Sequence, residues 1–212
     1  MGEIALLDMD QYRLLVAVRY LNASEDICKG LQRQRGANDF HFLITLRSFI
    51  EYTRRGIWFL AWASDETLRE AEKLTFDRPG SPSLASMDAM ISEALGTGKV
   101  SPLMDKMPGT NEPFLNCLHA LTHGNPISVR FTTFGLGKIF NTERLLVKVE
   151  LELGIFKILL YRRTLGEDIN AIWNMLAPIH DRPGDVQANV LIAAHLLRQS
   201  GKVAPSLGYR FP

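Results

Sequence analysis

Residues 42–60 read Phe-Leu-Ile-Thr-Leu-Arg-Ser-Phe-Ile-Glu-Tyr-Thr-Arg-Arg-Gly-Ile-Trp-Phe-Leu, and their pattern sets the expectation for the whole chain. Apolar side chains recur at steps of three and four residues, namely Phe42, Leu43, Leu46, Phe49, Ile50, Ile57 and Leu60. This period is typical of an amphipathic α-helix, because 3.6 residues complete one turn. Asn38 is a suitable N-cap, so we expect the helix to run from there to about Trp62.

The same period extends in both directions from this segment. We expect further helices over residues 8–35, 64–74, 87–95, 112–124, 142–164, 168–179 and 186–199. Breaker-rich residues 77–85 and residues 125–140 are expected to be loops, and the tail 201–212 is expected to be extended. Because neither a repeat nor βαβ alternation is visible, the sequence predicts an all-α fold. Its architecture would be a single domain over residues 1–212, an antiparallel helical bundle with two long helices and several shorter packed ones.

The overall composition excludes several classes of protein. The chain is 46% hydrophobic and 22% charged, a balance that supports a folded core and excludes global disorder. Its formal net charge of +1 excludes binding to nucleic acid through bulk positive charge. Any contact with nucleic acid would therefore depend on a local patch.

Three further observations favour a cytoplasmic protein. Cys28 and Cys117 lie within apolar helical pattern, so we expect both thiols to be reduced and buried. The first residues lack the basic segment and apolar core of a signal peptide. No apolar run approaches the roughly 20 residues that a membrane-spanning helix needs, so no membrane association is expected.

A polar stripe on the predicted helix 112–124 is the strongest candidate for a functional site. Glu112, Asn116, His119 and His123 follow one another at spacings of four, three and four residues. In a helix this spacing places all four side chains on one face. Gly124 should end the helix, which puts His123 in its last turn.

Three interpretations of this stripe remain open. It could be a hydrogen-bonded polar seam inside the bundle, since buried polar groups need partners. It could bind a metal through His119 and His123, but no further His/Cys pair with ligand spacing is present, and we expect no metal. It could perform acid–base chemistry, because histidine titrates near neutral pH. With arginine to hold a phosphodiester, the third interpretation would suit RNA cleavage in which the 2′-hydroxyl of the substrate attacks.

No cofactor is expected from the two glycine–lysine segments. Gly96-Thr-Gly-Lys99 and Gly135-Leu-Gly-Lys138 look like fragments of a phosphate-binding loop. A complete loop requires Ser or Thr after the lysine, and the first segment has Val100 there. Both segments are better interpreted as connectors.

Arginines on the helix 38–62 supply a candidate anion site. Arg47, Glu51 and Arg54 share one face of this helix. They could form intrahelical ion pairs, a half-buried structural network, or a guanidinium pair that a carboxylate aims at phosphate. The half-buried structural network is the favoured interpretation, and phosphate binding is the functional role that we predict for this set.

The chain also resembles a known family in three short motifs. These are Leu46-Arg-Ser-Phe-Ile-Glu-Tyr-x-Arg-x-x-x-Trp58, then Ala63-Ser-Asp-Glu66, then a polar helix that ends in Thr122-His-Gly124. Together they resemble a group of bacterial helical proteins related to the HEPN superfamily. The resemblance covers roughly residues 10–165, and it implies a HEPN-like core over about 8–165, with C-terminal helices over about 166–200.

The resemblance also implies a helical bundle that forms a homodimer and is associated with toxin–antitoxin or phage-defence systems. Active members are metal-independent RNases that use an arginine and, a few residues later, a histidine. In this chain the histidine would be His123, but Asn116 stands in the region of the arginine. Either Arg47 or Arg54 substitutes from another helix, or the chain is a non-catalytic relative.

The sequence therefore predicts a cytoplasmic HEPN-like bacterial protein that acts on RNA or binds it in defence or stress response. In the catalytic version His123 is the acid and base, His119 and Asn116 position the substrate, and Arg47, Glu51 and Arg54 form the phosphate site. The partners would be a second copy of the chain, RNA and a cognate protein. The alternative is a non-catalytic interaction module, such as an antitoxin or scaffold.

Overall fold

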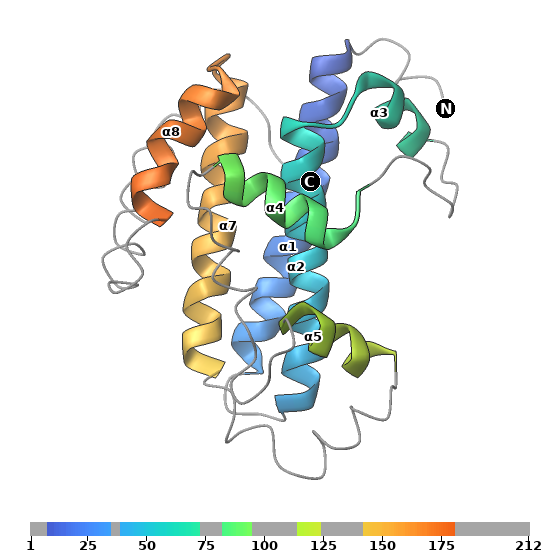
Figure 1. The fold of residues 1–212 in the computed structure, drawn as a ribbon, viewed down its shortest axis with the longest axis vertical. Coiled ribbons are helices and arrows are strands. Elements are labelled where there is room, and N and C mark those ends of the chain that lie inside the picture. The colour runs from blue at the N-terminus through green and yellow to red at the C-terminus, as the bar shows by residue number, and fades with distance from the viewer. Residues whose placement is uncertain (1–7, 35–38, 73–81, 95–113, 124–141, 181–212) are drawn as a thin grey trace.

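The computed structural model describes residues 8–34, 39–72, 82–94, 114–123 and 142–180, and every regular element in these ranges is an α-helix (Figure 1). The helices are α1 (Met9–Arg33), α2 (Asp39–Ala61), α3 (Asp65–Glu72), α4 (Leu84–Ala94), α5 (Phe114–Thr122), α7 (Thr142–Thr164) and α8 (Ile169–His180). The predicted all-α fold is confirmed. None of these helices is long and apolar enough to cross a membrane.

Three long helices form the centre of the molecule. α1, α2 and α7 have 25, 23 and 23 residues and lie side by side (Figure 1). Gln34, at the end of α1, contacts Thr45 near the start of α2, whereas Arg13 near the start of α1 contacts Ala63 just after α2. α1 and α2 therefore run antiparallel. The predicted architecture had two long helices, one fewer than the structure shows, because α7 is a third long helix in this central group.

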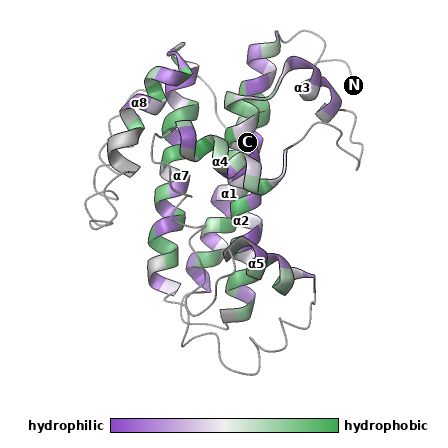
Figure 2. Ribbon diagram, in the orientation of Figure 1, coloured by the Kyte–Doolittle hydropathy of each residue, from purple (hydrophilic) through white to green (hydrophobic). Residues whose placement is uncertain are grey.

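The hydrophobic core lies along α2 and α7 in separate clusters of buried residues. Near the start of α2, Phe42, Leu46 and Phe49 are buried together with Leu118 of α5. Over residues 151–160 α7 is buried around most of its circumference, and Figure 2 shows hydrophobic residues along this helix, while α3 is mostly hydrophilic. A helix that is apolar on most sides is stable only when other elements cover it.

Close packing at Gly56 holds the three central helices together. A Cβ built at this position would lie 2.7 Å from the Cβ of Tyr20 on α1 and 2.6 Å from a ring carbon of Phe156 on α7. Real Cβ atoms do not approach other carbon atoms so closely. A glycine is therefore needed where α2 meets α1 and α7.

Polar residues cap the starts of several helices. Ser64 accepts a hydrogen bond from the amide of Thr67 at 3.2 Å and caps α3, which was predicted to begin there. Asp168 accepts from the amide of Asn170 at 2.9 Å and begins α8. The prediction for α4 was wrong at its start. Ser83 accepts from the amide of Ser86 at 3.1 Å, so α4 begins at Leu84, inside the segment that was expected to be a loop.

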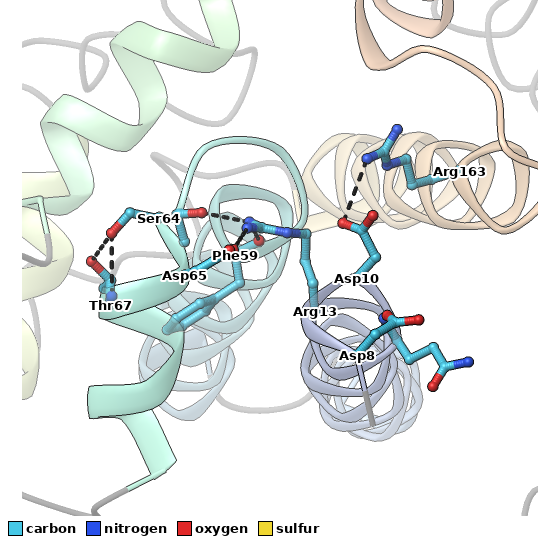
Figure 3. A network of polar contacts seen from close by, with 10 residues as sticks. Asp8, Asp10, Arg13, Phe59, Ser64, Asp65, Thr67 and Arg163 are labelled. Atoms are coloured by element: carbon cyan, nitrogen blue, oxygen red, sulfur yellow. Dashed lines mark hydrogen bonds and ion pairs between the residues drawn. The ribbon is translucent and has the colours of Figure 1, made fainter. Parts of the chain in front are cut away.

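Arg13 joins the start of α1 to the junction between α2 and α3 (Figure 3). Its Nη1 donates to the carbonyl oxygens of Phe59, at 3.0 Å, and Ala63, at 2.5 Å. Its Nη2 donates to Oδ1 of Asp65 at 2.9 Å. The last carbonyl groups of a helix have no partner within the helix, and a basic side chain from another helix satisfies them here.

Several predictions lie outside the described residues. They are the loop 125–140, the helix 186–199, the extended tail 201–212 and the position of Glu112.

Candidate functional site

α5 presents the predicted polar stripe on its exposed face. Asn116, His119 and His123 are exposed, whereas Leu118 and Leu121 on the opposite face are buried. The buried face packs against α2. The interpretation of the stripe as a polar seam inside the bundle is therefore wrong for these three residues. An exposed stripe is open to solvent and to a ligand.

Arg47 of α2 joins this stripe from the side. Its Nη1 lies 3.0 Å from Nδ1 of His119. A guanidinium is always a donor, so Nδ1 of His119 must be the acceptor. The neutral imidazole then carries its proton on Nε2, which makes Nε2–H a donor. We call Arg47, Asn116, His119 and His123 the Arg47–His119 cluster.

The surroundings of His119 keep its imidazole neutral. Loss of solvent around the ring, the Arg47 guanidinium and His123 lower the pKa of His119 below its usual range. The rings of His119 and His123 lie close together, with their centroids 4.2 Å apart. The cluster thus combines a fixed cation with two adjacent imidazoles, and one of these is held neutral.

Glu51 links Arg47 to a second arginine. Its Oε2 lies 3.9 Å from Nη2 of Arg47, and its Oε1 accepts from Nε and Nη2 of Arg55 at 3.1 and 3.0 Å. The two arginines and one carboxylate leave a net positive charge on this side of α2. Nε of Arg47 is buried and has no hydrogen-bond partner among the described residues. Glu51 thus orients the arginines but does not cancel their charge.

Arg54 does not belong to the cluster. It is fully buried, its Nε donates to Oδ1 of Asp88 on α4 at 2.9 Å, and its Nη2 donates to Oε1 of Glu152 on α7 at 3.0 Å. Its Nη1 also bonds Glu152, which makes that pair bidentate. Burial alone would lower the pKa of Arg54, but the carboxylates of Glu152 and Asp88 outweigh this effect and raise it.

The structural network is therefore realised for Arg54, while Arg47 is partly buried, with 15% of its side chain exposed. Arg47 and Arg54 are seven residues apart and project from nearly the same side of α2, about 10 Å from each other along its axis. α5 packs beside Arg47, and α4 covers Arg54 (Figure 1). The exposure of each arginine therefore depends on which short helix packs over it, α5 at Arg47 or α4 at Arg54.

Two buried acids escaped the sequence-based prediction. Asp88 and Glu152 hold Arg54, yet neither was proposed as a partner. Glu152 did carry a signal, because it is flanked by Leu151 and Leu153 in a helix that is otherwise apolar. A carboxylate in such a position requires a cation.

In the part of the chain that the structure describes, no group of three or more His, Cys, Asp or Glu side chains lies close enough to hold a metal ion. Within the same part, His119 and His123 thus have no carboxylate or thiol positioned to complete a metal site with them.

Comparisons with protein-family models, with curated proteins and with solved structures find no match to this chain.

Proposed function

We propose that the Arg47–His119 cluster binds the phosphodiester backbone of RNA and cleaves it without a metal. The observation that carries this proposal is the hydrogen bond from Arg47 to Nδ1 of His119, beside the ring of His123. It brings together a phosphate-binding group and two groups that can exchange protons. These groups come from two helices that are far apart in the sequence.

Each member of the cluster has a role in this reaction. Arg47 binds the phosphate and stabilises the negative charge that develops on it. Nε2–H of His119 donates to a phosphate oxygen, and the amide of Asn116 positions the ribose. His123 takes the proton from the 2′-hydroxyl, whose oxygen attacks phosphorus. The bond to the 5′ oxygen breaks, and His123 returns the proton to that oxygen, leaving a cyclic phosphate and a 5′-hydroxyl.

The resemblance to the HEPN superfamily supports the same proposal from the sequence. In that family a histidine near the start of a helix, or in the turn before it, acts with an arginine. Here His123 stands at the end of α5 instead, and Arg47 of α2 would provide the arginine that α5 lacks. By the same resemblance, the chain would act as a homodimer in the cytoplasm, in bacterial defence or stress response, and with a cognate partner protein.

A second candidate function is a non-catalytic interaction module, such as an antitoxin or scaffold. The observation that favours it is the burial of Arg54. Of the two arginines predicted for the phosphate site, Arg47 alone contacts the histidine stripe. A module of this kind would use the exposed face of α5 to bind its partner and would not cleave RNA.

Incubation of total RNA with the purified protein in EDTA separates these functions. The matched control for His123→Ala is His41→Ala, because His41 is also an exposed histidine but lies near the start of α2, outside the cluster. The proposal expects cleavage by the wild type and by His41→Ala, with loss of cleavage in His123→Ala and Arg47→Ala. Cleavage by all four proteins, or by none, would refute the catalytic proposal.

A further inference from the structure

Tyr52 places an exposed aromatic ring on the same helix as Arg47. Its side chain is 42% exposed, although most large hydrophobic residues of the described ranges are buried. One side of the ring is supported by Tyr20 of α1, with the two centroids 5.8 Å apart. Tyr20 in turn stacks on Phe59 at 5.4 Å. Tyr52 is thus the outer member of a row of packed rings, which restricts its motion and leaves it accessible.

A partly exposed side of α2 leads from the cluster to this ring. Taking 100° per residue and Arg47 as the origin, Glu51, Arg55 and Tyr52 follow at about 40°, 80° and 140° around the helix. Along the axis, Tyr52 lies about 7.5 Å beyond Arg47. The surface strip therefore begins at α5 with Arg47 and His119, passes the ion pair of Glu51 and Arg55, and ends at Tyr52 beside α1.

A cationic strip that ends in an exposed aromatic ring matches the chemistry of a single strand of RNA. Phosphates bind arginine, and an unpaired base stacks on an aromatic side chain whatever its sequence. In a duplex the faces of the bases are occupied by their neighbours, so a single ring on a convex helix has nothing to stack on. Ion-pairing alone would not distinguish the two forms of RNA in this way.

We infer that Tyr52 is a stacking site for an unpaired base of single-stranded RNA whose backbone binds at Arg47. The inference rests on the proposed function and extends it, because it defines the substrate as single-stranded and adds a residue outside the Arg47–His119 cluster. Tyr52 takes no part in proton transfer. Its role is to hold the strand across α2.

Fluorescence anisotropy with three probes tests this inference. The probes are a labelled 2′-O-methyl oligoadenylate, which cannot be cleaved because its 2′ oxygen carries no proton, the matching 2′-O-methyl duplex and an abasic single strand. The variants are Tyr52→Ala, Tyr52→Phe, Arg47→Ala and a control, Leu165→Ala. Leu165 is the other large hydrophobic residue that is exposed in the described ranges, and it follows α7.

For Tyr52→Ala we expect the affinity for the single-stranded oligoadenylate to fall about fivefold or more, as loss of one stacked base predicts. Tyr52→Phe should keep the affinity, because its ring still stacks, and Leu165→Ala should bind as the wild type does. The affinity of Tyr52→Ala for the abasic strand should equal that of the wild type. Arg47→Ala should weaken binding to all three probes.

The outcomes also separate this inference from the function on which it rests. If wild type and Tyr52→Ala bind the oligoadenylate equally, the stacking site is refuted and RNA binding at Arg47 stands. If Tyr52→Ala loses the same factor on all three probes, Tyr52 supports the fold and the inference fails. If the wild type binds none of the probes, the inference and the proposed function fail together.

Discussion

Arg47 on α2 and His119 on α5, 72 residues apart in the chain, are joined by a hydrogen bond of 3.0 Å between Nη1 and Nδ1. This contact fixes the position of the imidazole and its tautomer at the same time, because only an unprotonated Nδ1 can accept from arginine. Protonation of His119 would break the bond and place two cations in contact. The titration of His119 therefore depends on the charge of Arg47.

Arg47→Gln should raise the pKa of His119. After loss of solvent around the ring, the Arg47 guanidinium is the largest cause of the lowered pKa, and the substitution removes its charge. NMR titration of the imidazole Hε1 and Hδ2 signals measures this change. Arg55→Gln is the matched control, because it removes the same charge two turns further along α2 and should have a much smaller effect. Equal shifts in the two variants would contradict a direct contact.

The lowered pKa of His119 also predicts how stability changes with pH. In the unfolded chain this histidine has an ordinary pKa of about 6.5, so it binds a proton more readily there than in the fold. Its contribution to stability is present above that pKa and decreases as the pH falls through it toward the folded value. His119→Gln should lose this component, which urea unfolding at several pH values would detect as a smaller decrease below neutral pH.

The helices were largely predictable because their signals are local. α7 runs from Thr142 to Thr164, the same bounds that the sequence predicts. The start of α4 was not predicted, because Ser83 follows a run of proline, glycine and serine that is typical of a loop. A serine cap and a turn-forming serine have the same local sequence, and burial of Met87 in the core decides between them.

The candidate site was predictable only in part, because its composition depends on tertiary packing. Spacing alone placed Asn116, His119 and His123 on one face of α5, and the structure agrees. The same spacing made Arg47 and Arg54 equivalent members of one stripe. They differ because two short helices cover α2 at different levels, and no pattern within α2 contains that information.

Arg54→Met should destabilise the protein strongly. The substitution leaves the carboxylates of Asp88 and Glu152 in the core without their guanidinium, and removal of one partner from a buried ion pair typically costs about 3–5 kcal/mol. Urea unfolding followed by circular dichroism gives the free energy of unfolding. Arg47→Gln should cost less, because its ion pair with Glu51 is long, at 3.9 Å, and both side chains are partly exposed. Similar losses of unfolding free energy in the two variants would contradict a larger contribution from the buried network.

Gly56→Ala and Gly30→Ala should change stability in opposite directions. At Gly56 a methyl group would collide with Phe156 and with Cβ of Tyr20, and overpacking of this kind costs about 1–3 kcal/mol. At Gly30 a methyl group meets nothing within 4 Å, so alanine should stabilise α1 by about 0.5–1 kcal/mol. Thermal unfolding of the two variants measures both effects. A rise in melting temperature for Gly56→Ala would refute the close approach of the three helices.

Arg13→Ala should loosen the junction between α2 and α3. The carbonyl groups of Phe59 and Ala63 lose their donor, and two hydrogen bonds at roughly 0.5–1.5 kcal/mol each predict a loss of about 1–3 kcal/mol. The amide of Leu68, which donates to Ser64 at 3.0 Å in the first turn of α3, should exchange hydrogen faster. Asp65→Asn is the control: Asp65 is 55% exposed, so its ion pair with Arg13 should contribute less than about 1 kcal/mol. If Asp65→Asn cost as much as Arg13→Ala, the ion pair rather than the capped carbonyl groups would hold α3 in place.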